Sequence, residues 1–157
     1  MNGKYQNATK LLDKARQWPE RLGVGKPFDV DNRFEDYLVG VCALKSGDKA
    51  RSQELFQQVA AYTRSHAADQ GVNRLFGALA GKALGHESAS TKLVDQWSAD
   101  GKSPAARWLM SVVKADNAEA AASERELKGA STVSLLGRAS VDQDLALLVE
   151  VFHSIKF

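Results

Sequence analysis

The chain has 157 residues, of which 44% are hydrophobic and 25% are charged, a composition typical of a soluble globular domain. Its formal net charge is +2 and its charged residues are interspersed, so no basic block indicates binding to nucleic acid or to an anionic membrane. Cys42 is the single cysteine, which excludes a disulfide within the chain. No apolar run approaches the roughly 20 residues of a membrane span, and the N-terminus shows no signal peptide, so we expect a cytoplasmic protein.

Apolar residues recur with a helical period and strand signals are nearly absent, which predicts an all-α fold. A first helix at 5–18 ends before Pro19, and a loop at 20–31 follows. Asn32 and Glu35 have capping-box spacing at the start of the next helix. Helical hairpins are expected at 32–64, 73–99 and 104–128, with turns at Gly47, Gly85 and Asp116. The segment 131–157 is expected to hold C-terminal capping helices, and its last helix, 141–155, is apolar on two sides.

No single hairpin of this kind can bury its apolar stripe, so neighbouring hairpins must stack. We therefore expect one domain over 1–157, built as a right-handed α-solenoid of about three to four antiparallel hairpins with about eight helices. Residues 1–19 look like half of a hairpin, which predicts that the chain is a fragment of a longer protein.

The hairpins share small residues at fixed places. Gly40 lies seven residues before Gly47, and Phe56 follows on the second helix. Other positions fit the same register: Gly3, Ala8, Leu12, Ala15, Pro19, Ser52, Ala78, Gly85 and Ser90. In this pattern the chain from Met1 to Lys128 resembles the tetratricopeptide repeat (TPR). The resemblance implies paired helices with a concave protein-binding face. Val94 stands where the repeat pattern has an aromatic residue. Because of such departures from the pattern, we expect helix pairing more than regular superhelical geometry.

A narrower resemblance lies in the first loop. The runs 16–19 and 22–27, followed by a helix opening near Asn32, resemble the C-terminal TPR region of certain large bacterial proteins. Those proteins carry an N-terminal domain of unknown function with the character of a sugar-binding β-sandwich.

Candidate chemical motifs are incomplete. The run from Gly23 to Pro27 departs from a phosphate-binding loop, because proline follows its lysine and a helix precedes it. Asp29, Asp31 and Asn32 lack the glycine and terminal glutamate of a calcium loop. The histidines have no i, i+4 partner: His66, His86 and His153. We therefore predict no catalytic residue, no metal and no cofactor.

In each of the three hairpins, one arginine lies near the start of the first helix, where a cation opposes the helix dipole. They are Arg33, Arg74 and Arg107. With Tyr37 and Lys82 they form the predicted binding residues of a concave face, where arginines can pair with a carboxylate or an acidic peptide. The alternative is that each arginine pairs with a neighbouring acidic residue such as Asp36.

Three functions follow as hypotheses. The first is a non-enzymatic scaffold that binds a protein or peptide. The second is a structural repeat module that docks onto a missing catalytic or carbohydrate-binding domain of the parent chain, or forms a homodimer through the C-terminal helix. An enzyme is the third and least expected, because convergent acid, base or nucleophile spacing is missing.

Overall fold

The computed structural model describes residues 2–17, 29–67, 73–97, 104–130 and 149. These residues form seven helices and contain no strand, so the all-α prediction is confirmed for this part of the chain. The helices are α1 (Asn2–Ala15), α2 (Arg33–Lys45), α3 (Lys49–Ser65), α4 (Arg74–Ala83), α5 (Glu87–Trp97), α6 (Pro104–Lys114) and α7 (Asn117–Ala130). The predicted C-terminal helices, except for the buried Val149, and residues 20–28 of the predicted loop lie outside the described residues.

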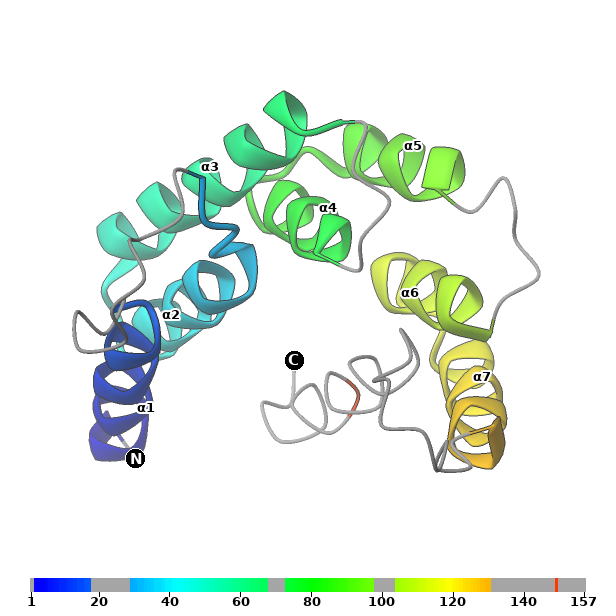
Figure 1. The fold of residues 1–157 in the computed structure, drawn as a ribbon, viewed down its shortest axis with the longest axis horizontal. Helices are drawn as coiled ribbons and strands as arrows, with labels where there is room; N and C mark the ends of the chain where they lie inside the picture. Colours follow the sequence, from blue (N-terminus) through cyan, green and yellow to red (C-terminus); the bar gives the residue numbers. More distant parts are fainter. Residues whose placement is uncertain (1, 18–28, 68–72, 98–103, 131–148, 150–157) are drawn as a thin grey trace. The chain divides into compact units, whose positions relative to one another are not determined.

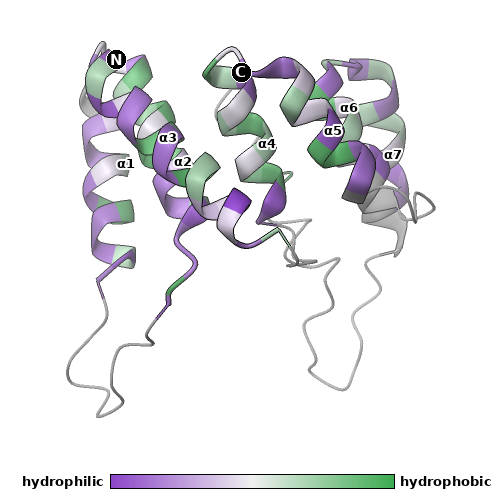
Figure 2. Ribbon diagram, turned by 90° about the horizontal axis from the view of Figure 1, so that it is seen from above, coloured by the Kyte–Doolittle hydropathy of each residue, from purple (hydrophilic) through white to green (hydrophobic). Residues whose placement is uncertain are grey.

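The chain divides into two compact units, Met1–Glu87 and Ser88–Phe157. In the first unit, α1 packs on α2, α2 on α3 and α3 on α4, and α2 also contacts α4 (Figure 1). In the second unit, α6 packs on α7, and Lys114 Nζ lies 3.4 Å from Asp95 Oδ1 of α5. Each helix carries both hydrophobic and hydrophilic residues, as expected for helices with one buried face (Figure 2).

An aromatic cluster fills the core of the first unit. Tyr37 of α2 lies between Phe56 of α3 and Phe76 of α4, with ring centroids 5.4 and 5.5 Å away. Phe34 adds a contact with Phe76 at 5.2 Å. Each such pair contributes about 0.5–1.5 kcal/mol beyond the area that it buries. The cluster therefore joins α2, α3 and α4 through side chains that the apolar stripes already marked.

Two glycines allow these helices to approach closely. A Cβ added to Gly40 would lie 2.7 Å from Cε1 of Phe56, and one added to Gly77 would lie 2.5 Å from Cβ of Thr63. Gly40 thus takes the place of the small residue expected between α2 and α3. Gly77 does the same between α3 and α4, next to the predicted Ala78, which is itself fully buried.

Three turns between consecutive helices share one backbone motif. The residues Gly47, Gly85 and Ala115 all have positive φ, at 90°, 82° and 57°. In each turn the next residue donates its N–H to a carbonyl five residues back: Asp48 to Ala43 (2.9 Å), His86 to Gly81 (2.8 Å) and Asp116 to Ser111 (2.8 Å). The positive-φ residues bond three residues back, to Leu44, Lys82 and Val112. These are Schellman turns, so the repeat seen in the sequence recurs as the same local geometry.

Aspartates begin the helices that follow two of these turns. Asp48 Oδ1 accepts from the backbone N–H of Arg51 at 3.1 Å, and Asp116 Oδ1 accepts from the backbone N–H of Glu119 at 3.1 Å, so both aspartates act as N-caps. The predicted cap of α2 is wrong in its side chain: Asn32 holds the N-cap position but makes no cap hydrogen bond. Asp31 supplies the oxygen instead, because its Oδ1 lies 3.1 Å from the Arg33 backbone nitrogen.

Candidate functional site

A cluster of polar side chains gathers where the start of α2, the end of α3 and the start of α4 meet. We call it the Asp31 cluster. It consists of Asp29, Asp31, Arg33, Tyr62, His66 and Asn73. Its hydrogen-bonded members Asp31 and Asn73 lie 42 residues apart in the chain, so the cluster exists only after the first unit has folded.

Asp31 holds the centre of this cluster. Its Oδ1 accepts from Arg33 Nε at 2.9 Å, and its Oδ2 accepts from an Arg33 terminal nitrogen at 2.7 Å and from Asn73 Nδ2 at 2.8 Å. Burial raises the pKa of Asp31, but the hydrogen bonds from Arg33 and Asn73 outweigh burial and hold it below its ordinary value of 3.8. The carboxylate therefore neutralises Arg33 and links the start of α2 to the start of α4.

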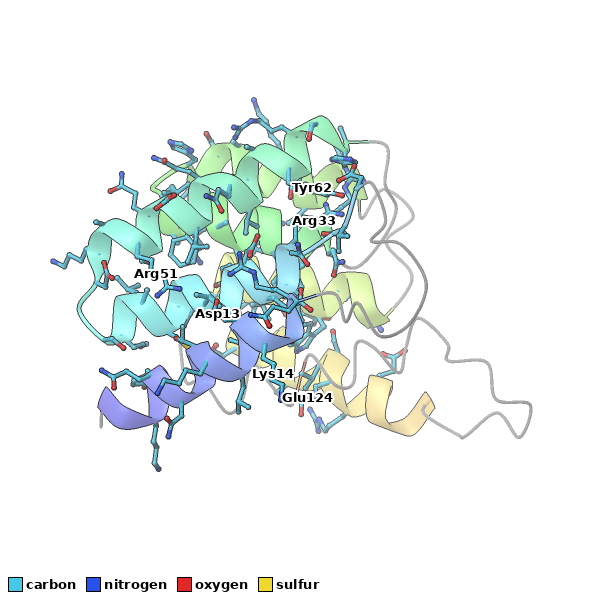
Figure 3. All side chains as sticks on the ribbon, turned by 60° about the vertical axis from the view of Figure 1, so that its left-hand side comes forward. Asp13, Lys14, Arg33, Arg51, Tyr62 and Glu124 are labelled. Atoms are coloured by element: carbon cyan, nitrogen blue, oxygen red, sulfur yellow. The ribbon has the colours of Figure 1, made fainter. Side chains whose placement is uncertain are left out.

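Tyr62 extends the cluster toward the C-terminus of α3. The guanidinium of Arg33 lies 5.1 Å from the centre of the Tyr62 ring, a cation–π contact (Figure 3). His66 is a second partner of Tyr62, and its ring stacks on the Tyr62 ring with the centroids 3.9 Å apart. His66 Nε2 in turn lies 2.8 Å from Asp29 Oδ2. These contacts attach residues 29–33 to the last turn of α3.

Ser65, His66 and Asp29 are the residue types of a hydrolytic triad, and Ser65 Oγ lies 3.0 Å from His66 Nδ1. Ser65 and His66 instead make hydrogen bonds to the backbone at the end of α3. Ser65 Oγ donates to the carbonyl of Tyr62 at 2.9 Å, and His66 Nδ1 lies 3.0 Å from the same oxygen. His66 is the C-cap residue of α3, so these bonds satisfy the end of that helix rather than activate the serine.

The structure buries three of the predicted binding residues. Arg33, Tyr37 and Arg74 are 2%, 3% and 6% exposed. Tyr37 packs within the aromatic cluster, and burial raises its pKa well above the ordinary value of 10.0. Asn73 binds the carboxylate that holds Arg33, so Arg33 and Arg74 both lie at the same end of the first unit.

The other two predicted residues are less buried. Lys82 is half-buried on α4, and Arg107 is 38% exposed. Arg107 is in the second unit, where it forms an ion pair with Glu126 of α7. Pairing with nearby acidic residues, the alternative weighed from the sequence, therefore holds for Arg33 and Arg107, although Asp36 is not the partner. Asp36 Oδ1 lies 3.0 Å from Nε of Arg16, the residue that follows α1, instead.

Sequence reasoning missed the bridging role of Asp31 and the part played by Tyr62. Asp31 was weighed only as a calcium ligand, and Asn73 only as the start of a helix. No local pattern connects residues 42 positions apart, so only tertiary structure reveals their hydrogen bond.

Comparisons with known proteins add no relative. No protein-family model matches the chain, and neither a curated protein nor a solved structure does. Within the described residues, no group of three or more histidine, cysteine or acidic side chains is placed to hold a metal ion. No helix in that part of the chain has the length and apolar character needed to cross a membrane.

Proposed function

We propose that the chain is a TPR-like α-solenoid that acts as a non-enzymatic scaffold and binds a protein or peptide. The observation that carries the proposal is the recurrence of one turn geometry between consecutive helices, with Schellman turns at Gly47, Gly85 and Ala115. Repeated helical hairpins are the building units of solenoids, whose stacked first helices form an extended binding face. Lys82, a half-buried basic residue of α4, would face the partner there.

The packing in the first unit agrees with a scaffold. Consecutive helices contact each other in chain order, and Gly40 and Gly77 set the spacing of successive pairs. In the Asp31 cluster, Arg33 forms an ion pair with Asp31, and Asp29 contacts His66. This arrangement fixes helix ends, which a rigid binding surface requires.

The test is an unbiased peptide-library selection on the purified protein, followed by fluorescence anisotropy with the selected peptides. Lys82→Glu on α4 should weaken binding, because it reverses a charge on a first helix. The matched control is Lys92→Glu on α5, an exposed lysine on a second helix, which should leave binding unchanged. If both variants lose the same affinity for the selected peptides, or if neither variant loses any, the proposed binding face is contradicted.

Light scattering on the same samples tests the alternative of self-association. A monomer that binds selected peptides agrees with the scaffold. A stable dimer that binds none of them would favour a dimerisation module instead.

A further inference from the structure

Arg74, the first residue of α4, is buried, and no acidic side chain of the described residues pairs with it. It is 6% exposed, and its Nε is shielded from solvent without a hydrogen-bond partner. No carboxylate of the described residues forms an ion pair with it, whereas Arg33 is paired with Asp31 and Arg107 with Glu126. Of the three arginines that begin hairpins, Arg74 therefore differs in how its charge is balanced.

The N-terminus of α4 adds to this positive site. Asn73 holds the N-cap position but makes no cap hydrogen bond, because its side-chain amide donates to Asp31. The first turn of α4 has no acidic residue, whereas α2 has Glu35 and Asp36 there. The N-terminus of this ten-residue helix, which carries a partial positive charge, thus has no acidic residue in its own first turn and no side-chain cap.

The Cα–Cβ bond of a helical residue tilts toward the N-terminus, so the side chain of Arg74 leaves the backbone in the direction of this helix end. A buried cation without a partner is strongly unfavourable, and an anion that binds there would relieve this cost. The guanidinium fork matches a carboxylate in a bidentate manner, and helix N–H groups favour the same charge. The nearby Asp31 carboxylate disfavours a doubly charged anion more than a singly charged one.

We propose that Arg74 and the first turn of α4 bind a carboxylate from an acidic side chain of a partner peptide. This proposal rests on the scaffold function and names the chemistry of its partner. Arg33 is not part of this site, because Asp31 already occupies its guanidinium.

The test is an NMR titration of the ¹⁵N-labelled chain that follows the Nε–H signals of the arginines. The probe is a capped hexaglutamate peptide, with capped hexaglutamine as the uncharged control and inorganic phosphate as a rival anion, all at matched ionic strength. We expect a saturable shift of the Arg74 Nε–H signal with hexaglutamate, and none with hexaglutamine.

Variants separate this site from general attraction between charges. Arg74→Gln should weaken hexaglutamate binding at least tenfold, and Arg74→Lys should weaken it less, because lysine keeps the charge but loses the fork. Arg51→Gln is the matched control, since Arg51 is 46% exposed and lies 3.6 Å from Asp13 Oδ2 (Figure 3). It should leave the affinity within twofold.

Three results would overturn the carboxylate site: no shift at Arg74, equal loss in Arg74→Gln and Arg51→Gln, or tighter binding of phosphate than of hexaglutamate. If Arg74→Gln fails to fold, Arg74→Lys carries the test with the same criteria. If library-selected peptides bind the wild type and Arg74→Gln equally well, the scaffold function stands and the carboxylate site fails.

Discussion

Ala115 occupies a backbone conformation that favours glycine, and replacing it should stabilise the protein. Its φ is 57°, whereas glycine holds the equivalent place in the other two turns, at Gly47 and Gly85. A left-handed conformation costs a residue with a Cβ about 1–2 kcal/mol. Glycine at this position removes that cost, but the greater conformational freedom of its unfolded chain offsets about 0.4–1 kcal/mol of the stability gained. Ala115→Gly should therefore raise the free energy of unfolding by about 0.5–1 kcal/mol.

The assay is urea denaturation followed by circular dichroism at 222 nm. Gly47→Ala is the matched reverse substitution, because a Cβ added there meets nothing within 4 Å and only the backbone conformation changes. It should lower the free energy of unfolding by a similar amount. A loss of stability in Ala115→Gly, as glycine causes within ordinary helices, would refute the Schellman geometry at the third turn.

Three further predictions concern the first unit. Ser52→Ala should raise the free energy of unfolding by about 1 kcal/mol, because the buried Ser52 hydroxyl has no hydrogen-bond partner. Gly77→Ala should lower it by about 3 kcal/mol, the upper end for overpacking, because the added Cβ would lie 2.5 Å from Thr63 Cβ. Asp31→Asn should lower it by about 3 kcal/mol at pH 7, because Arg33 would lose the carboxylate that balances its buried charge. All three are measured by urea denaturation.

Each of these predictions has a control in the chain. Ser123→Ala should be destabilising, because Ser123 Oγ donates to Glu119 at 3.1 Å, and a gain there would contradict the hydrogen-bond argument. Gly85→Ala adds a Cβ in open space at positive φ, so a cost equal to that of Gly77→Ala would rule out steric crowding. Asp36→Asn should be neutral or stabilising at pH 7, since burial raises the pKa of Asp36.

The pH dependence of the Asp31 variant follows from the direction of the pKa shift. Because the folded state holds the pKa of Asp31 below 3.8, the stability from its ionised form is present above pH 3.8 and is lost as pH falls through the lowered value. The difference between wild type and Asp31→Asn should shrink as the pH drops below 3.8. A difference that stays constant from pH 7 to pH 2 would show that the carboxylate charge contributes nothing.

Much of the fold could be predicted because its signals are local. Apolar stripes marked the helices, and glycines marked two of the three turns. The third turn was located by Asp116, but its positive-φ residue, Ala115, has no sequence signal because alanine favours ordinary helix. The crowding of Gly77 against Thr63 could not be predicted either, since it depends on how closely α3 and α4 pack.

The candidate site was less predictable than the fold. The three arginines were predicted as binding residues because cations near a helix N-terminus oppose the helix dipole. The burial of Arg33 and Arg74 depends on long-range packing, which the sequence does not show. The hydrogen bond between Asn73 and Asp31 leaves α4 without the cap that its sequence offers. Arg33 is neutralised by Asp31, two residues before it, whereas no carboxylate of the described residues pairs with Arg74.

The anisotropy titration of the purified chain with library-selected peptides tests the scaffold claim most directly. The account predicts saturable binding that Lys82→Glu weakens and Lys92→Glu does not. If no selected peptide binds saturably to the folded wild-type chain, the claim is contradicted.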